Sequence, residues 1–333
     1  MKNTTLFIIK PDFFMTMNFD GKKITIFGGN GFIGKTLISK LCAFSCRVEV
    51  VTRKKKNHND LRFLGGLGQV NVAVINKFNE KEIQEIISDS DIVINLIGIL
   101  FENKKQKFEN VHVEIPKMIA NVSKKLQIKY FIHLSALGVD KNTVSKYALS
   151  KRKGELEIIK IFSNSIIIRP SVVFGSEDNF INLFSKMSVF LPILPLLGTP
   201  NIVYKKKYFP EIDFKHGVNF QPIYVGDLAD YIISTFGKKK LILDLAGPNI
   251  FSFKEILKLI CKAKKIRRLL IPVPLFLAKI LAFFLEKLPT PLLTIDQVKM
   301  LNDDNVSKEG YENLEKIIKH PKSLNIILPT YIN

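Results

Sequence analysis

The chain has 333 residues, of which 47% are hydrophobic, so it can bury a sizeable core, and this argues against global disorder. Its formal net charge is +20, and lysine supplies nearly all of the excess. Lysine attracts anions diffusely, and we find no zinc-finger spacing, no aromatic RNA-binding signature and no recognition-helix pattern. We therefore expect no nucleic-acid partner, and instead an anionic membrane surface or a phosphorylated cofactor.

The three cysteines, Cys42, Cys46 and Cys261, are too few and odd in number for a disulfide framework, which fits a reducing cytoplasm. No apolar run reaches the roughly 18 residues that a membrane-spanning helix needs. Residues 1–21 are mildly apolar but interrupted by charges and a proline, so we interpret them as an N-terminal extension and not as a signal peptide.

A strand is predicted at residues 23–27, followed at once by a glycine-rich turn and by helical apolar spacing over 35–41. Three glycines at this spacing allow a tight turn, a close approach of the backbone to a pyrophosphate, and close packing of helix on strand. A purely structural glycine turn is the alternative, but the second strand at 47–52 favours a dinucleotide site. The cofactor-binding residues assigned to this turn are Gly28, Asn30, Gly31, Phe32, Ile33 and Gly34.

The end of the second strand indicates which dinucleotide binds. An NAD site usually offers a carboxylate there to the ribose 2′-hydroxyl, whereas this chain offers Arg53 followed by Lys54–Lys56. Cations would bind a 2′-phosphate, so we predict NADP(H) rather than NAD(H), with Arg53 as its ligand. The alternative is a solvated lysine turn.

Strands and helices go on alternating, which predicts an α/β fold with a doubly wound parallel (Rossmann) sheet. Ligands of such sheets lie at the carboxyl ends of the strands. We therefore add Asn76, Leu96 and Gly98 to the cofactor site. The further expected elements are strands at 70–75, 91–98 and 130–135 and helices at 80–88 and 108–126.

Tyr147 and Lys151 are four residues apart at the start of a predicted helix, so they share one helix face. An ammonium group beside a phenol favours the phenolate, which would let Tyr147 exchange protons near neutral pH. Lys151 could also bind the ribose of the cofactor. A hydroxyl at the end of the preceding strand would complete a catalytic site, and Ser135 is the candidate.

These motifs resemble the short-chain dehydrogenase/reductase superfamily, in its extended and atypical branches of the NAD-dependent epimerase/dehydratase kind. The proline in Arg169–Gly175 matches the one that this superfamily places beside the nicotinamide, which adds Pro170 to the cofactor site. One departure concerns the third catalytic group: the resemblance places Ala136 where redox-active members carry Ser or Thr. Because adjacent residues of a strand face opposite sides, Ser135 would serve only if the strand end were shifted.

The second half of the chain is expected to form a smaller α/β lobe. Residues 191–198 are broken by prolines and cannot form a regular helix, and residues 201–219 are expected to be a loop or lid. Residues 253–263 predict a helix. The almost wholly apolar stretch 275–288 is either a core helix or an interfacial helix on a membrane.

The order of segments from Arg267 to Pro329 narrows the resemblance to the dehydrogenase-like accessory subunit family of respiratory complex I (NADH:ubiquinone oxidoreductase) and its bacterial relatives. That resemblance implies a tightly held NADPH, complex I subunits or quinone-biosynthesis proteins as partners, and a peripheral position on the cytoplasmic, inner face of the energy-transducing membrane. An active oxidoreductase or epimerase/dehydratase remains the alternative. We divide the chain into residues 1–21, a dinucleotide-binding domain at 22–175 and a C-terminal lobe at 176–333, with a return to the first domain around 220–245.

Overall fold

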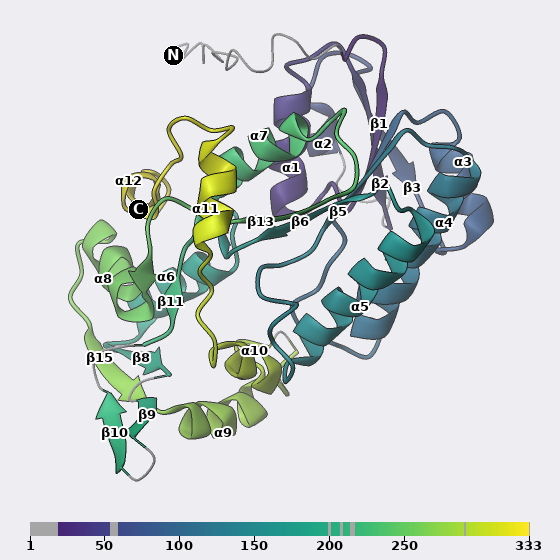
Figure 1. Cartoon of the computed structure of the whole chain (residues 1–333). Coiled ribbons are helices and arrows are strands. Elements are labelled where there is room, and N and C mark those ends of the chain that lie inside the picture. The colour runs from purple at the N-terminus through teal and green to yellow at the C-terminus, as the bar shows by residue number, and fades with distance from the viewer. Residues whose placement is uncertain are drawn as a thin grey trace, which may run out of the picture.

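The computed structural model describes residues 19–53, 59–198, 201–206, 209–213, 217–289 and 291–332, with backbone only for residues 59–60 and 201–213. The predicted lysine cluster Lys54–Lys56 and most of the N-terminal extension lie outside these residues. Figure 1 shows a twisted sheet covered by helices and, beside it, a smaller lobe of helices and short strands formed by the second half of the chain. The predicted fold class is therefore confirmed.

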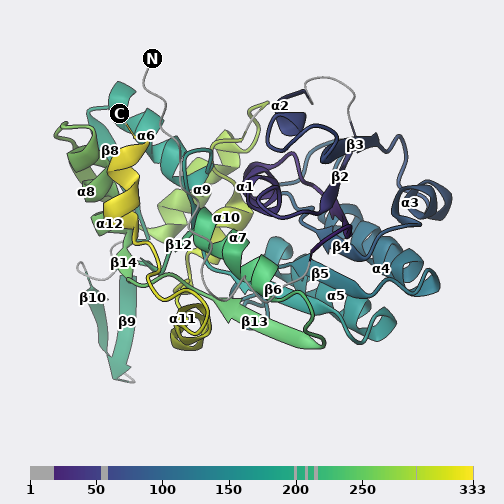
Figure 2. The same ribbon diagram turned by 90° about the horizontal axis from the view of Figure 1, so that it is seen from above.

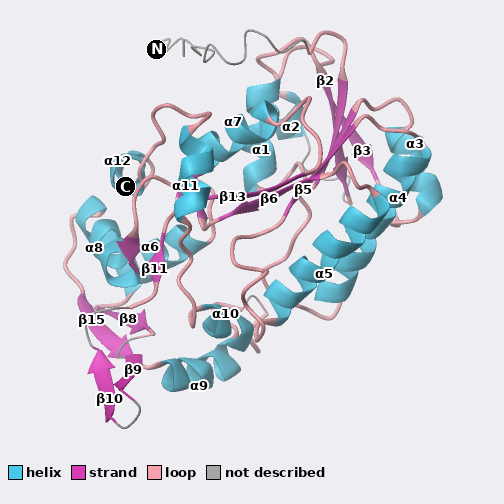
Figure 3. Ribbon diagram, viewed as in Figure 1, coloured by secondary structure: helices cyan, strands magenta, loops and turns pink. Residues whose placement is uncertain are grey.

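The sheet at the centre of the larger part is seven-stranded and its strands are all parallel (Figure 3). The strand order is β13-β6-β5-β4-β1-β2-β3, so the winding direction reverses between β1 and β4, where ligands bind to such sheets. The strands are β1 (Lys23–Phe27), β2 (Arg47–Thr52), β3 (Val70–Val74), β4 (Ile92–Asn95), β5 (Tyr130–Leu134), β6 (Ile166–Pro170) and β13 (Leu241–Leu245).

Helices cover both faces of the sheet because its strands carry isoleucine and valine toward each side (Figure 2). Ile132 and Leu134 of β5 belong to the core on the side of α1 and α7, whereas Phe131 belongs to the core under α4 and α5. The helices are α1 (Phe32–Leu41), α2 (Asn59–Arg62), α3 (Glu80–Ile87), α4 (Ile115–Lys125), α5 (Lys146–Ile161), α7 (Val225–Ser234) and α11 (Lys308–Glu315).

Two elements near the switch point differ from their predictions. The fourth strand ends at Asn95 rather than at residue 98, because the Asn95 side chain accepts a hydrogen bond from the Ile97 N–H at 3.1 Å and turns the chain away from the sheet. The helix expected at 108–126 begins as a π-helical segment, η2 (Glu109–Glu114), and continues as α4. Such π-helical turns widen a helix and often occur at functional sites.

The smaller lobe has its own core, in which phenylalanine rings from α6, β11 and α8 contact one another at 5.0–6.2 Å between centroids. Short strands connect it to the sheet. Its elements are α6 (Phe180–Phe190), α8 (Phe253–Ala263), α9 (Leu275–Leu285), α10 (Ile295–Met300), α12 (Leu324–Ile327), η3 (Leu328–Thr330), β7 (Val173–Phe174), β8 (Ile193–Leu197), β9 (Asn201–Lys206), β10 (Phe209–Asp213), β11 (Asn219–Phe220), β12 (Ile223–Tyr224), β14 (Phe251–Ser252) and β15 (Leu269–Val273).

Residues 191–198 are indeed not helical: they form β8, which pairs in parallel with β15 although each strand contains a proline. Proline is tolerated here because the sheet has only two strands, so each one has an outer edge that needs no hydrogen bond. The loop expected at 201–219 is wrong for its first part, since β9 and β10 form an antiparallel hairpin.

An exposed apolar surface extends over one edge of the smaller lobe. Within α9, Ala278 and Ala282 are buried, while Phe276 and Phe284 are each 63% exposed, so the core-helix alternative for this segment is wrong. Further exposed apolar residues precede β8 and lie in β15, which leads through Pro274 into α9. We call the exposed residues of Val189–Ile193, β15 and α9 the apolar edge. Among the described residues, no helix is long and apolar enough to cross a membrane.

Candidate functional site

The glycine turn lies at the carboxyl end of β1, at the switch point of the sheet. Gly28 has φ +79°, and a Cβ atom added there would lie 3.1 Å from the Ile97 backbone nitrogen. Gly34 faces the backbone of Gly29 so closely that a side chain has no room. Helix α1 is thereby brought tightly against β1, and we call this turn, which packs on the backbone that follows β4, the glycine cradle.

The N-terminus of α1 faces this cradle. Its N-cap is Gly31, no side chain caps it, and its first turn contains no acidic residue. The N–H groups of that turn, which begins with Phe32 and Ile33, therefore keep the positive end of the helix dipole available for a phosphate. The Phe32 ring lies beside Gly175, where an added Cβ would approach it to 3.0 Å. The turn thus contacts the segment that follows β6.

Arg53 follows the last residue of β2 and is exposed. The Gln106 amide, with its oxygen turned toward the guanidinium, accepts hydrogen bonds from it at 2.8 and 3.2 Å. Asn76, one residue beyond Ile75, is also exposed, and its backbone N–H is bonded to Glu82 at 2.9 Å. Both residues lie at the predicted rim, and Arg53 presents a cation where an NAD site would present a carboxylate.

Tyr147 and Lys151 lie on successive turns of α5, and both side chains are buried. The Lys151 ammonium group donates a hydrogen bond to the Leu134 carbonyl at 3.1 Å, and it lies close to Gly98, where an added Cβ would approach it to 3.2 Å. The predicted pair and the predicted Gly98 are therefore brought together at the ends of β4 and β5.

Burial changes the pKa values of this pair. It raises the pKa of Tyr147 to about 12, and it lowers the pKa of Lys151 to about 8 against the opposing charge of Glu155. The direction for tyrosine is opposite to the one expected from a neighbouring ammonium group, because the loss of hydration on burial sets the pKa of Tyr147. At neutral pH the phenol therefore keeps its proton and can donate it.

His112, which we did not predict, joins the π-helical turn to α5. Its Nε2 accepts a hydrogen bond from the Ile99 N–H at 3.1 Å, and its Nδ1 is 2.8 Å from the Ser150 hydroxyl, which itself donates to the Tyr147 carbonyl at 2.8 Å. These contacts fit a neutral imidazole with its proton on Nδ1. Burial, and then the charge of Lys151, lowers the pKa of His112 to about 2.

The rings around Tyr147 restrict its position. The His112 ring meets it edge to face at 5.3 Å, and Phe108, which stacks on His112 at 5.2 Å, meets it edge to face at 6.0 Å. A single histidine within an expected helix does not change its hydrophobic periodicity, so the contact of His112 with Tyr147 could not be predicted from the pattern. The π-helical turn that presents His112 could not be inferred from spacing.

Ser135 lies on the same face of the sheet as α5. The ladder of hydrogen bonds continues past β5, from Ser135 N–H to Ile168 and from Leu137 N–H to Pro170, so the strand alternation also continues. Phe131, on that alternation, packs under α5. Ser135, and not Ala136, therefore shares the face of Tyr147 and Lys151 without any shift of the strand.

The Ser135 hydroxyl is buried and has no hydrogen-bond partner among the described residues. A buried hydroxyl without a partner is unfavourable unless a ligand supplies one. Pro170 ends β6 beside it and accepts the hydrogen bond from Leu137 at 2.8 Å. The glycine cradle, the uncapped helix end and this hydroxyl all fit a bound dinucleotide.

Asp296 is a second residue that sequence reasoning did not identify. It belongs to α10 of the smaller lobe, yet its carboxylate accepts hydrogen bonds from the Ser145 hydroxyl at 2.9 Å and from the N–H groups of Lys146 and Tyr147 at 2.7 and 2.9 Å. It therefore caps the N-terminus of α5 together with Ser145. Pairing over this sequence distance leaves no local pattern.

This combination of sheet order, glycine cradle and α5 pair defines a class, the NAD(P)-binding proteins of short-chain dehydrogenase type. The chain belongs to the NAD dependent epimerase/dehydratase family, whose model matches residues 24–189.

Within that class, the chain is similar over most of its length to a subunit of a respiratory enzyme. It is 30% identical to NADH dehydrogenase (ubiquinone) 1 alpha subcomplex subunit 9, mitochondrial, of Dictyostelium discoideum, over 89% of this chain and 80% of that protein. To the same subunit of Mus musculus it is 29% identical, over 92% of this chain and 78% of that protein. These relatives confirm the resemblance stated from the sequence.

Solved structures support the fold alone. The NADPH-dependent quinone oxidoreductase of Escherichia coli, in complex with NADPH, has a TM-score of 0.71 with 13% identity, over 93% of this chain and 100% of that chain.

Proposed function

We propose that this protein is an NADP(H)-binding, dehydrogenase-like accessory protein of respiratory complex I, placed peripherally on the cytoplasmic, inner face of an energy-transducing membrane close to ubiquinone. The observation that carries the proposal is the extent of the similarity. It covers 89% of the chain for the Dictyostelium subunit, and so reaches into the lobe with the apolar edge, beyond the residues 24–189 that the family model matches.

The assignment of NADP(H) rests on the rim of the sheet. Gly28, Gly31 and Gly34 would hold the pyrophosphate against the α1 terminus, and Arg53 would bind the 2′-phosphate. In NAD sites this position usually offers a carboxylate to the ribose. NAD(H) is the weaker candidate, because a cation gives it no added binding energy there.

The nicotinamide end would lie against α5. Lys151 would bind the ribose, and Tyr147, protonated at neutral pH, can donate a hydrogen bond or a proton toward the Ser135 side. A bound nicotinamide supplies hydride chemistry. In the accessory role a bound cofactor stabilises the fold by mass action alone, without turnover.

The membrane position rests on charge and on the apolar edge. A helix with Phe276 and Phe284 exposed buries these rings favourably in acyl chains, and the net charge of +20 attracts anionic headgroups. An amphipathic surface of this kind suits a protein that lies on a membrane rather than across it.

A second candidate is a working oxidoreductase or an epimerase/dehydratase-type enzyme, for example one acting on a quinone precursor among quinone-biosynthesis proteins. The specific observation in its favour is that Ser135 shares the face of Tyr147 and Lys151. This position supports Ser135, in place of Ala136, as a third catalytic hydroxyl.

The first experiment is purification of the full chain from its own membranes in mild detergent, with the partners identified by mass spectrometry. Complex I subunits in fixed ratio, together with NADP(H) released by acid, are the expected result. Recovery of the protein alone, or with quinone-biosynthesis proteins, would overturn the accessory role and favour the enzyme.

The second experiment separates the two candidates with Tyr147→Phe. An accessory protein keeps its NADP(H) content and its partners in this variant, whereas an enzyme loses its turnover at least a hundredfold, the usual contribution of a positioned acid or base. Tyr130→Phe, at the opposite end of β5, is the matched control and should leave both readouts unchanged.

A further inference from the structure

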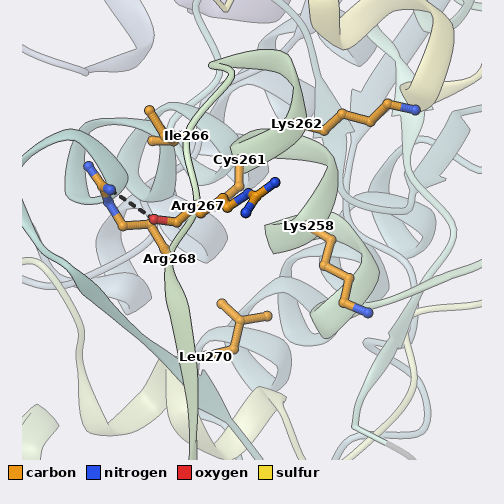
Figure 4. A pocket seen from close by; sticks show the side chains of 7 residues that line it. All are labelled: Lys258, Cys261, Lys262, Ile266, Arg267, Arg268 and Leu270. Atoms are coloured by element: carbon orange, nitrogen blue, oxygen red, sulfur yellow. Dashed lines mark hydrogen bonds between the residues drawn. The ribbon is translucent and has the colours of Figure 1, made fainter.

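A cationic hollow lies where α8 ends and β15 begins. It has a volume of about 440 Å³, and Figure 4 shows its side chains. Four cations line it, Lys258 and Lys262 from α8 and Arg267 and Arg268 from the loop, with Ile266 and Leu270 as apolar walls. The Lys258, Lys262 and Arg267 side chains extend to one side, and Arg268 extends to the other (Figure 4).

The three cations on one side are available to a ligand. Lys258, Lys262 and Arg267 are exposed, and they form no ion pair in the described parts of the chain. Glu255, one turn before Lys258, is turned to Ser252, whose backbone N–H and hydroxyl donate to it at 2.7 and 2.8 Å. Hydrogen bonds from Ser252, and to a smaller extent the charge of Lys258, lower the pKa of Glu255. The mutual repulsion of these like charges is relieved when an anion binds between them.

Arg268 has a different role. Its Nε donates to the Ser188 carbonyl at 2.7 Å, so its guanidinium holds the end of α6 against the start of β15. The next residues of α6 and β15 begin the apolar edge: Val189 is 50% exposed, Phe190 83% and Leu269 62%. The hollow and the apolar edge therefore meet at Arg268, which lines the hollow and contacts the Ser188 and Val189 carbonyls.

We propose that this hollow binds the phosphate group of an acidic phospholipid, whose acyl chains lie along the adjacent apolar edge. A phosphate oxygen matches ammonium and guanidinium donors. A soluble anion would gain nothing from Phe190 and Leu269, whereas a lipid uses both surfaces at once, and this is why the lipid is the occupant. The proposal rests on the membrane association proposed above and adds its ligand and its docking residues.

The test is flotation of the full chain with vesicles of phosphatidylcholine, alone or mixed with phosphatidylglycerol. Wild type is expected to bind the mixed vesicles preferentially. Each basic side chain near an anionic surface contributes about 1 kcal/mol, so Lys258→Ala with Arg267→Ala should weaken binding roughly 25-fold in total. Both side chains are exposed, so the fold should tolerate the change.

The matched control removes two exposed lysines at the far end of the molecule, Lys81→Ala with Lys124→Ala. Equal weakening by both double variants would overturn the site in favour of diffuse net charge. Full displacement from the vesicles by inorganic phosphate, at an ionic strength matched with sodium chloride, would assign the hollow to soluble anions and overturn the lipid.

A variant of the apolar edge separates this inference from the proposed function. If wild type binds both kinds of vesicle equally and Phe276→Ser with Phe284→Ser abolishes that binding, membrane association stands and the hollow alone is refuted. If wild type binds neither kind of vesicle, the proposed membrane association fails and the lipid site falls with it.

Discussion

Arg169 and Glu155 join β6 to α5 through two parallel hydrogen bonds, Nε to Oε1 at 2.8 Å and Nη2 to Oε2 at 2.7 Å. Both side chains are buried, and Glu155 lies one turn after Lys151 on the same helix. Asp140 adds a contact to the guanidinium at 3.1 Å. The pair thus fixes the helix of Tyr147 against the strand that ends in Pro170.

Removing one partner of this pair should destabilise the fold strongly. Arg169→Met leaves the Glu155 carboxylate buried without its main partner, and we expect the free energy of unfolding to fall by about 3 kcal/mol. This is the lower end of the range for buried ion pairs, because Arg152 still bonds Glu155 at 3.0 Å. Urea unfolding measures it. Arg169→Met with Glu155→Leu should recover most of the loss. Lys160→Met, which removes the exposed partner of Glu157 on α5, should change stability by less than about 0.5 kcal/mol.

Asp296→Ala should loosen the first turn of α5. The substitution removes the acceptor of three hydrogen bonds, and we expect about 2 kcal/mol of destabilisation and faster amide exchange at Lys146 and Tyr147. Hydrogen-exchange mass spectrometry reads the helix directly. Asp304→Ala, which removes a similar acceptor of Asn219 within the smaller lobe, should leave exchange in α5 unchanged. Equal exchange in both variants would contradict the role of Asp296.

Lys151 should make stability depend on pH in the alkaline range. Its pKa falls from 10.5 to about 8 on folding, so between these values the unfolded chain binds more protons and stability rises with pH. In Lys151→Met this contribution is absent. We therefore expect the free energy of unfolding of wild type, relative to that of the variant, to rise by at most about 3 kcal/mol from pH 8 to 10.5. Below pH 8 the difference between the two proteins should stay constant. A difference that does not change with pH would contradict the buried ammonium group.

Arg53→Asp should reverse the proposed preference for NADP(H). Replacing the cation with a carboxylate repels a 2′-phosphate and offers an acceptor to the ribose hydroxyl, so NADPH binding should weaken at least tenfold while NADH binding holds or improves. Thermal shifts with each nucleotide measure both affinities. Arg47→Asp, at the opposite end of the same strand, is the matched control. Similar NADPH shifts in both variants would exclude Arg53 as the 2′-phosphate ligand.

The sequence predicted the parts of the fold that local patterns encode. The glycine turn after β1, the alternation of strands and helices, and the α5 pair depend on residues a few positions apart, so their spacing is visible in the chain. The β9–β10 hairpin was missed because its polar residues lack the alternation typical of half-buried strands.

The rest depends on contacts between distant segments. Asp296 reaches α5 across 149 residues. The strands β8 and β15 both contain a proline, and neither segment by itself predicts that the two would pair. The raised pKa of Tyr147 is likewise set by burial beneath Phe108 and His112, which no spacing reveals.

The cap of α5 by Asp296 has a consequence for synthesis. As the chain leaves the ribosome, Tyr147 emerges 149 residues before the carboxylate that completes its helix terminus. The edge strand β13, with Asp244 beside Arg169, also arrives late. A nascent chain that stops at residue 189 therefore lacks both, so the part of the molecule built on the seven-stranded sheet reaches its finished form only after the lobe beside it has been translated.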